Sequence, residues 1–118
     1  LSKIQEFLDD YPNSEYHEEA LATITEMRNK LATKLYESAR LYVKMEEYES
    51  AIITYEDLLA TYYDTEWVDE AHFQIVKCHA LAGDMDKASA YLATNRKLII
   101  NDDLIAKAEK LINETETN

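Results

Sequence analysis

One glycine and one proline in 118 residues leave this chain almost no means of making tight turns. β-Hairpins rely on glycine and proline at their turns, so a sheet of short strands is disfavoured. Apolar residues instead recur every three or four positions, as in Ile4, Phe7, Leu8 and Tyr11. This is the period of a helix with one buried face, and we therefore predict an all-α protein.

One phrase occurs twice in the chain. The segment YPNSEYHEEA at 11–20 returns 51 residues later (62 − 11 = 51) as YYDTEWVDEA at 62–71. Each copy is typical of a link between two helices, because Thr65 in the second copy, like its counterpart in the first, can cap the helix that follows. An aromatic residue comes next, Tyr16 or Trp67. We expect Trp67 to be largely buried against the preceding helix, where it would fix the entry angle of the chain.

Between the two links, residues 16–47 contain neither glycine nor proline. The stretch predicts one continuous helix over about 16–45, or two abutting helices with a mild bend. We expect about six helices in a single domain over 1–118, which the sequence marks as a fragment because it begins inside an amphipathic pattern. The expected helices are 1–12, 16–45, 48–62, 67–82, 85–98 and 102–114.

A spacing of 51 equals three units of 17, and 17 residues make about one helix and one turn. Segment 32–65 fits the tetratricopeptide pattern of large, small and aromatic positions, with Tyr63 where proline is usual. The matching residues are Leu35, Ala39, Tyr42, Ala51, Tyr55 and Leu58. A second repeat follows over 66–98, 1–12 is the closing helix of an earlier repeat, and 102–114 is a terminal helix. The expected fold is a right-handed α-α superhelix in which these residues are core.

The net charge of −12 disfavours nucleic acid and direct membrane binding, because both present negative charge. Nothing in the sequence suggests catalysis, since there is no glycine-rich phosphate loop and no serine with a partner base. His72 and His79 are about 10 Å apart along a helix, too far for one metal ion, and Cys78 is interpreted as a small buried filler. We predict no enzyme activity, no metal and no cofactor.

The order of these segments resembles the carboxy-terminal half of BamD-type outer-membrane assembly lipoproteins. The resemblance covers about residues 4–95 and rests on FLDDYPNSEYHEEA, NKLATKLYESARLY and ALAGDMDKASAYL. It departs from the family at Tyr63, where proline is usual, and lacks the lipid-bearing amino-terminal cysteine. The resemblance implies a non-enzymatic scaffold on the periplasmic face of the outer membrane, lipid-anchored in the full-length protein. Its implied partners are the periplasmic domains of the barrel-inserting core protein, other assembly lipoproteins and unfolded outer-membrane proteins.

The residues alone support a second interpretation, a soluble tetratricopeptide adaptor that binds a peptide in its concave groove. On the repeat pattern Tyr36, Arg40 and Lys44 face that groove, and Lys77 takes the corresponding place in the next repeat. Arg40 and Lys44 can equally pair with Glu37, Glu46 or Glu47 on the helix surface. A competing partner surface is the second link, with Tyr62, Tyr63 and Asp64.

Overall fold

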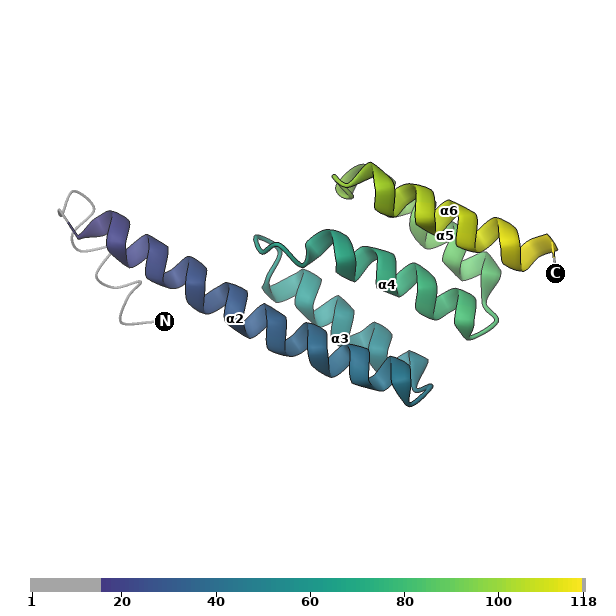
Figure 1. The fold of residues 1–118 in the computed structure, drawn as a ribbon, viewed down its shortest axis with the longest axis horizontal. Coiled ribbons are helices and arrows are strands. Elements are labelled where there is room, and N and C mark those ends of the chain that lie inside the picture. The colour runs from purple at the N-terminus through teal and green to yellow at the C-terminus, as the bar shows by residue number, and fades with distance from the viewer. Residues whose placement is uncertain (1–15, 118) are drawn as a thin grey trace.

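Five α-helices and one short 3-10 helix make up the described part of the chain, residues 16–117 of a computed structural model, with side chains as far as residue 114 (Figure 1). The helix expected over 1–12 lies outside these residues. The elements are α2 (His17–Lys44), α3 (Tyr48–Thr61), α4 (Val68–Leu81), α5 (Met85–Asn95), η1 (Arg96–Leu98) and α6 (Asp102–Thr117). No strand occurs among the described residues, and the prediction of an all-α fold is confirmed.

Helix α2 is one unbroken helix of 28 residues rather than two abutting ones. At 1.5 Å per residue it is about 42 Å long. Its carboxy-terminal half packs against α3, while its amino-terminal half extends past the other described helices (Figure 1). Leu21, Met27 and Leu31 on that half are exposed. Because no described helix covers them, this half of α2 presents apolar surface.

The α2–α3 and α4–α5 turns share one geometry. In each, the N–H groups of two successive residues bond back to carbonyls in the last turn of the preceding helix. The residue in the left-handed conformation is Gly83 in the second turn (φ 87°) but Glu46 in the first (φ 60°). Glycine adopts this conformation freely, whereas a residue with a Cβ pays roughly 1–2 kcal/mol. The first turn is therefore strained and the second is not.

The first hydrophobic core lies between α2, α3 and α4. One alanine from each helix, Ala39, Ala51 and Ala71, is fully buried, which lets the three helices approach closely. The space between them is filled by Tyr55, Leu58, Ile75 and Cys78. Tyr42 was expected in this core but is exposed. It lies in the last turn of α2.

The second core lies between α4, α5 and α6. Val76 and Ala80 enter it from the opposite face of α4, so α4 contributes to both cores. The residues from α5, α6 and the segment before α6 are Ala88, Leu92, Ile99, Leu104, Ile105, Ala108 and Ile112. Spacings of three and four in α6 give it one apolar face. Through this face, the terminal helix closes the stack.

Candidate functional site

A salt bridge ties the link after α3 to the middle of α2. The Arg28 guanidinium donates hydrogen bonds to both carboxylate oxygens of Asp64, at 2.7 to 3.0 Å, and a further one to the carbonyl of Thr61. It also lies over the rings of Tyr62 and Tyr63, at 5.3 and 5.7 Å from their centroids. The hydrogen bonds from Arg28 hold the pKa of Asp64 below its ordinary value. The link is therefore fixed in place from within the chain.

This arrangement bears on the three residues predicted as a competing partner surface. The structure brings Tyr62, Tyr63 and Asp64 together around one guanidinium, so the Asp64 carboxylate already has a partner. Tyr63 keeps 71% of its surface exposed. Sequence reasoning missed Arg28, because a basic residue 36 positions away gives no local signal.

Trp67 packs differently from the prediction. It is half-buried rather than largely buried, and besides packing against the first core it contacts α2 directly. Its indole Nε1–H donates to the Thr33 hydroxyl at 2.7 Å, and its ring stacks on Tyr36 at a centroid distance of 4.3 Å. Tyr36 in turn meets the ring of Tyr55 edge-on at 5.6 Å. Because α2 runs past the start of α4, it supplies the surface on which the indole lies.

The predicted cap of α4 is wrong, whereas the placement of Tyr36 in a groove stays a prediction. Thr65 does not cap α4, because its hydroxyl donates to the carbonyl of Tyr62 and the helix begins only at Val68. Tyr36, predicted to face a groove, is half-buried in the aromatic stack, and burial raises the pKa of its hydroxyl. One face of the Tyr36 ring is therefore in contact with the Trp67 indole.

Arg40 and Lys44 both lie exposed near the carboxy-terminal end of α2. They line a shallow groove of about 280 Å³ together with Glu37 and Leu41. Within residues 16–114, none of the ion pairs includes Arg40 or Lys44, so the predicted pairing with Glu37, Glu46 or Glu47 is not formed. Lys77 is half-buried on α4 and does not line this groove.

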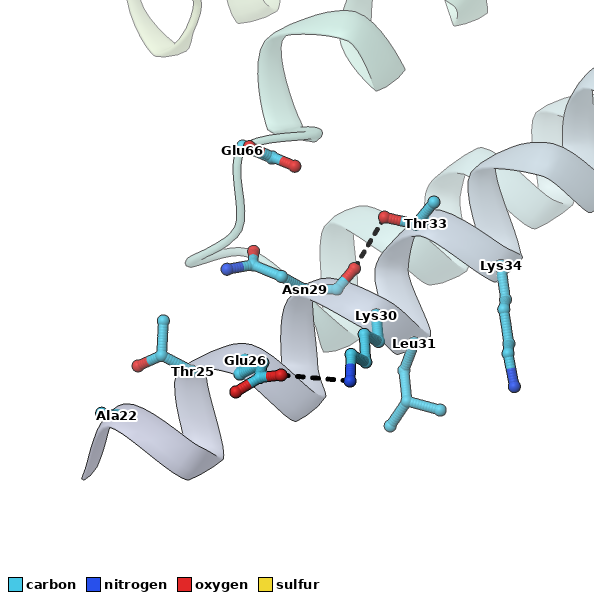
Figure 2. Close-up of a pocket in the computed structure, with 9 residues that line it drawn as sticks. All are labelled: Ala22, Thr25, Glu26, Asn29, Lys30, Leu31, Thr33, Lys34 and Glu66. Carbon is cyan, nitrogen blue, oxygen red and sulfur yellow. Dashed lines mark hydrogen bonds and ion pairs between the residues drawn. The ribbon is translucent and has the colours of Figure 1, made fainter. Parts of the chain in front are cut away.

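A larger groove of about 820 Å³ follows the same helix toward its amino-terminal end (Figure 2). Figure 2 shows the side chain of Glu66, from the link, across the groove from those of α2. Lys30 and Lys34 line it, and Lys30 pairs with Glu26 at 3.1 Å. Helix α2 has five basic against four acidic side chains in a chain of net charge −12. This helix is therefore the place where positive charge gathers.

The side chains of His72 and Cys78 are part of the packed interior. His72 is buried, its Nδ1 is 2.8 Å from the hydroxyl of Tyr91, and desolvation holds its pKa below the ordinary value. Cys78 is fully buried, which raises its pKa to about 11 and disfavours the reactive thiolate. Among the described residues, no three His, Cys, Asp or Glu side chains are grouped as a metal site requires. No helix in residues 16–117 is long and apolar enough to span a bilayer.

Helices α2 to α5 each contact their neighbours along the chain, and α6 packs on both α4 and α5, with small residues on the facing surfaces. That is the arrangement of a tetratricopeptide-like helical-repeat protein, a class built for protein binding rather than catalysis.

Comparison with known proteins identifies a family within this class. The model of the YfiO family, described as outer membrane lipoprotein, matches residues 1–94, and the chain belongs to this family. The BamD-like resemblance is thereby confirmed. No curated protein matched the chain. Residues 95–118, which include η1 and α6, lie beyond the matched range.

Proposed function

We propose that this chain is a non-enzymatic docking scaffold of the machinery that assembles β-barrel proteins in the outer membrane. Membership of the outer membrane lipoprotein family supports the location and the role in assembly. The partner is the set of periplasmic domains of the barrel-inserting core protein. The full-length protein works at the periplasmic face, held there by its lipid anchor, alongside other assembly lipoproteins and unfolded outer-membrane proteins.

The observation that carries the proposal is a mixed apolar and basic patch at the end of α2. Leu41 and Met45 are 57% and 52% exposed, and Arg40 and Lys44 stand beside them. Exposed large apolar side chains rimmed by unpaired charge are the composition of a protein interface. In a strongly acidic chain, two free cations also steer a partner that carries carboxylates. Both features lie on the final turns and the C-cap of one helix, so the patch is formed before binding.

The experiment measures binding of the chain to the core protein's periplasmic domains. The double variant Arg40→Glu with Lys44→Glu reverses the charge of the patch without touching the core. We expect Kd to rise about tenfold or more at low ionic strength, and the difference to shrink as salt screens the charges. The matched control is Lys87→Glu with Lys107→Glu, which makes the same change in net charge at exposed positions on α5 and α6. The control should bind like the parent chain.

An unchanged Kd for a folded Arg40/Lys44 variant removes the patch from the interface. If the control variant loses as much affinity, the net charge of the chain rather than the patch on α2 determines binding. Substitutions at Tyr62 and Tyr63 distinguish the competing link surface, because they should leave this affinity unchanged.

The groove in Figure 2 favours a second candidate, a general adaptor that binds an acidic peptide along α2. In that case Lys30→Glu with Lys34→Glu, rather than the Arg40 and Lys44 reversal, abolishes binding of the partner.

A further inference from the structure

A third groove lies at the carboxy-terminal end of α3, away from the patch on α2. It has a volume of about 650 Å³ and runs between the α3–α4 link and the segment that joins η1 to α6. Three of its side chains are apolar and largely exposed: Tyr63 at 71%, Leu98 at 59% and Ile100 at 88%. Side chains of this size are normally covered, so three of them around one groove mark a binding surface.

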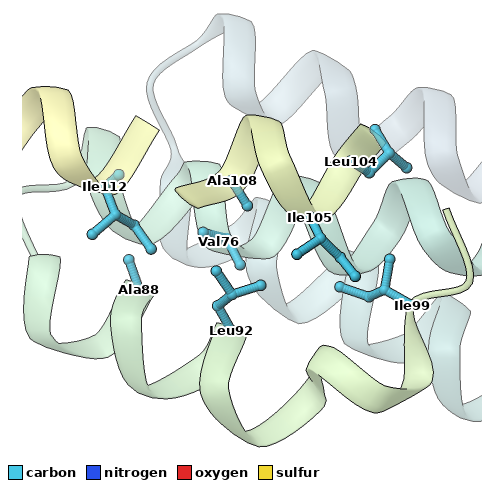
Figure 3. Close-up of a cluster of buried hydrophobic side chains, with 9 residues drawn as sticks. Val76, Ala88, Leu92, Ile99, Leu104, Ile105, Ala108 and Ile112 are labelled. Carbon is cyan, nitrogen blue, oxygen red and sulfur yellow. The ribbon is translucent and has the colours of Figure 1, made fainter. Parts of the chain in front are cut away.

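The exposed side chains are held in position rather than left loose. Ile100 and Asn101 donate their backbone N–H groups to the two carboxylate oxygens of Asp69, at 3.2 and 2.9 Å. The neighbouring Ile99 is buried in the second core, where Figure 3 shows it next to Ile105. With one isoleucine anchored inward and the next backbone N–H bound to α4, Ile100 is fixed pointing outward. Tyr63, on the other side of the groove, lies against Arg28.

The carboxylates among the residues that line the groove are not matched by any lining lysine or arginine. They belong to Asp64, Glu66 and Asp69. Asp64 is balanced by Arg28, and Asp69 is occupied by the two N–H groups, which leaves Glu66 without an ion pair among the described residues. His72, also in the lining, is buried and bonded to Tyr91. An apolar groove with a free carboxylate at its rim is complementary to an apolar side chain that has a cation beside it.

Leu98 and Ile100 also lie beyond the range that the family model matches, residues 1–94. The groove therefore depends on a part of the chain that the shared family pattern does not describe.

We propose that this groove binds a segment of a partner protein in which a bulky apolar side chain stands next to a lysine or arginine. The apolar side chain contacts Tyr63, Leu98 and Ile100, and the cation pairs with Glu66. The proposal does not rest on the function proposed above, because that function uses the patch at the carboxy-terminal end of α2 and an acidic partner.

The test is selection from a random peptide library displayed on phage, with the 118-residue chain as the target. Enriched peptides are synthesised and titrated against the chain and against Leu98→Ser with Ile100→Ser. The matched control is Ile53→Ser, which removes an apolar side chain of similar exposure from α3. Circular dichroism and urea unfolding verify that each variant is folded, as expected for exposed positions. Glu66→Gln tests the cation separately.

We expect enriched peptides that carry an apolar residue beside lysine or arginine. Their Kd should rise at least about tenfold in the Leu98/Ile100 variant, since about two apolar contacts are lost, and should not change in the Ile53 control. Glu66→Gln should weaken the same peptides less, and only at low salt. The proposal is overturned by a library that yields no such pattern, or by peptides that bind the Leu98/Ile100 variant as tightly as the parent. It is also overturned if sedimentation shows a dimer that this variant abolishes, because a second copy would then fill the groove.

Discussion

Replacing Glu46 by glycine should stabilise the protein, although it removes a side chain. Glu46 has φ 60° in the turn after α2, and the equivalent turn after α4 has Gly83 at φ 87°. Relief of the left-handed strain is worth roughly 1–2 kcal/mol, and the extra freedom of glycine in the unfolded chain costs roughly 0.5–1 kcal/mol. The net gain is about 0.7 kcal/mol. For a domain of this length the unfolding entropy is about 0.25 kcal/mol per kelvin, so the melting temperature should rise by about 3 °C.

The assay is urea and thermal unfolding followed by circular dichroism, with three companion variants. Glu46→Gln removes the same charge but keeps the strain, so the difference between the glutamine and glycine variants isolates the backbone effect. Glu37→Gly, in the interior of α2, should cost about 1 kcal/mol, because glycine there only loses entropy. Gly83→Ala should cost about 1–2 kcal/mol, since a Cβ there has open space around it but an unfavourable φ. If Glu46→Gly unfolds at lower urea than Glu46→Gln, the account of strain in this turn is wrong.

Two further predictions concern the link. Trp67→Ala should lower the free energy of unfolding by about 2 kcal/mol, because the indole is half-buried. Trp67→Phe should lower it by about 1 kcal/mol, because the hydrogen bond to Thr33 is lost. Equal losses for the two variants in urea unfolding would exclude a role for that bond. Arg28 holds the pKa of Asp64 below its ordinary value, so the ion pair stabilises the fold above pH about 4 and this contribution is lost as pH falls through the lowered pKa. Asp64→Asn should therefore cost about 0.5–1 kcal/mol at neutral pH, a value reduced for the half-exposed carboxylate, and nothing in strong acid; a pH-independent difference would contradict this.

The helices of the described residues follow from local pattern. The spacing of apolar residues and the absence of breakers over 16–47 are properties of neighbouring residues, so they predict α2 without knowledge of its surroundings. The small positions Ala39 and Ala51 are likewise correctly predicted as core, since only a small residue suits the close approach of two helices. The positions of Arg40 and Lys44 on an exposed face follow from helical periodicity alone.

What sequence reasoning missed depends on contacts between distant residues. The indole of Trp67 finds its partner on α2 because of how three helices meet, which no spacing within the link encodes. The pairing of Arg28 with Asp64 has the same origin. The left-handed Glu46 also gives no signal, since glutamate is an ordinary helix residue and the turn geometry imposes the conformation. The groove beside Ile100 needs Asp69 to hold a segment that is 31 residues away.

Among the described helices, only α4 has buried residues in both cores. Ala71, Ile75 and Cys78 lie on one face, and Val76 and Ala80 lie on the other. Because both cores share α4, the stability of the α2–α3 half depends on that of the α5–α6 half, and the reverse. Neither core can lose its packing without leaving one face of α4 bare, so the free energy of opening one half includes part of the other. Loss of packing in either core should therefore lower the stability of both halves of the stack.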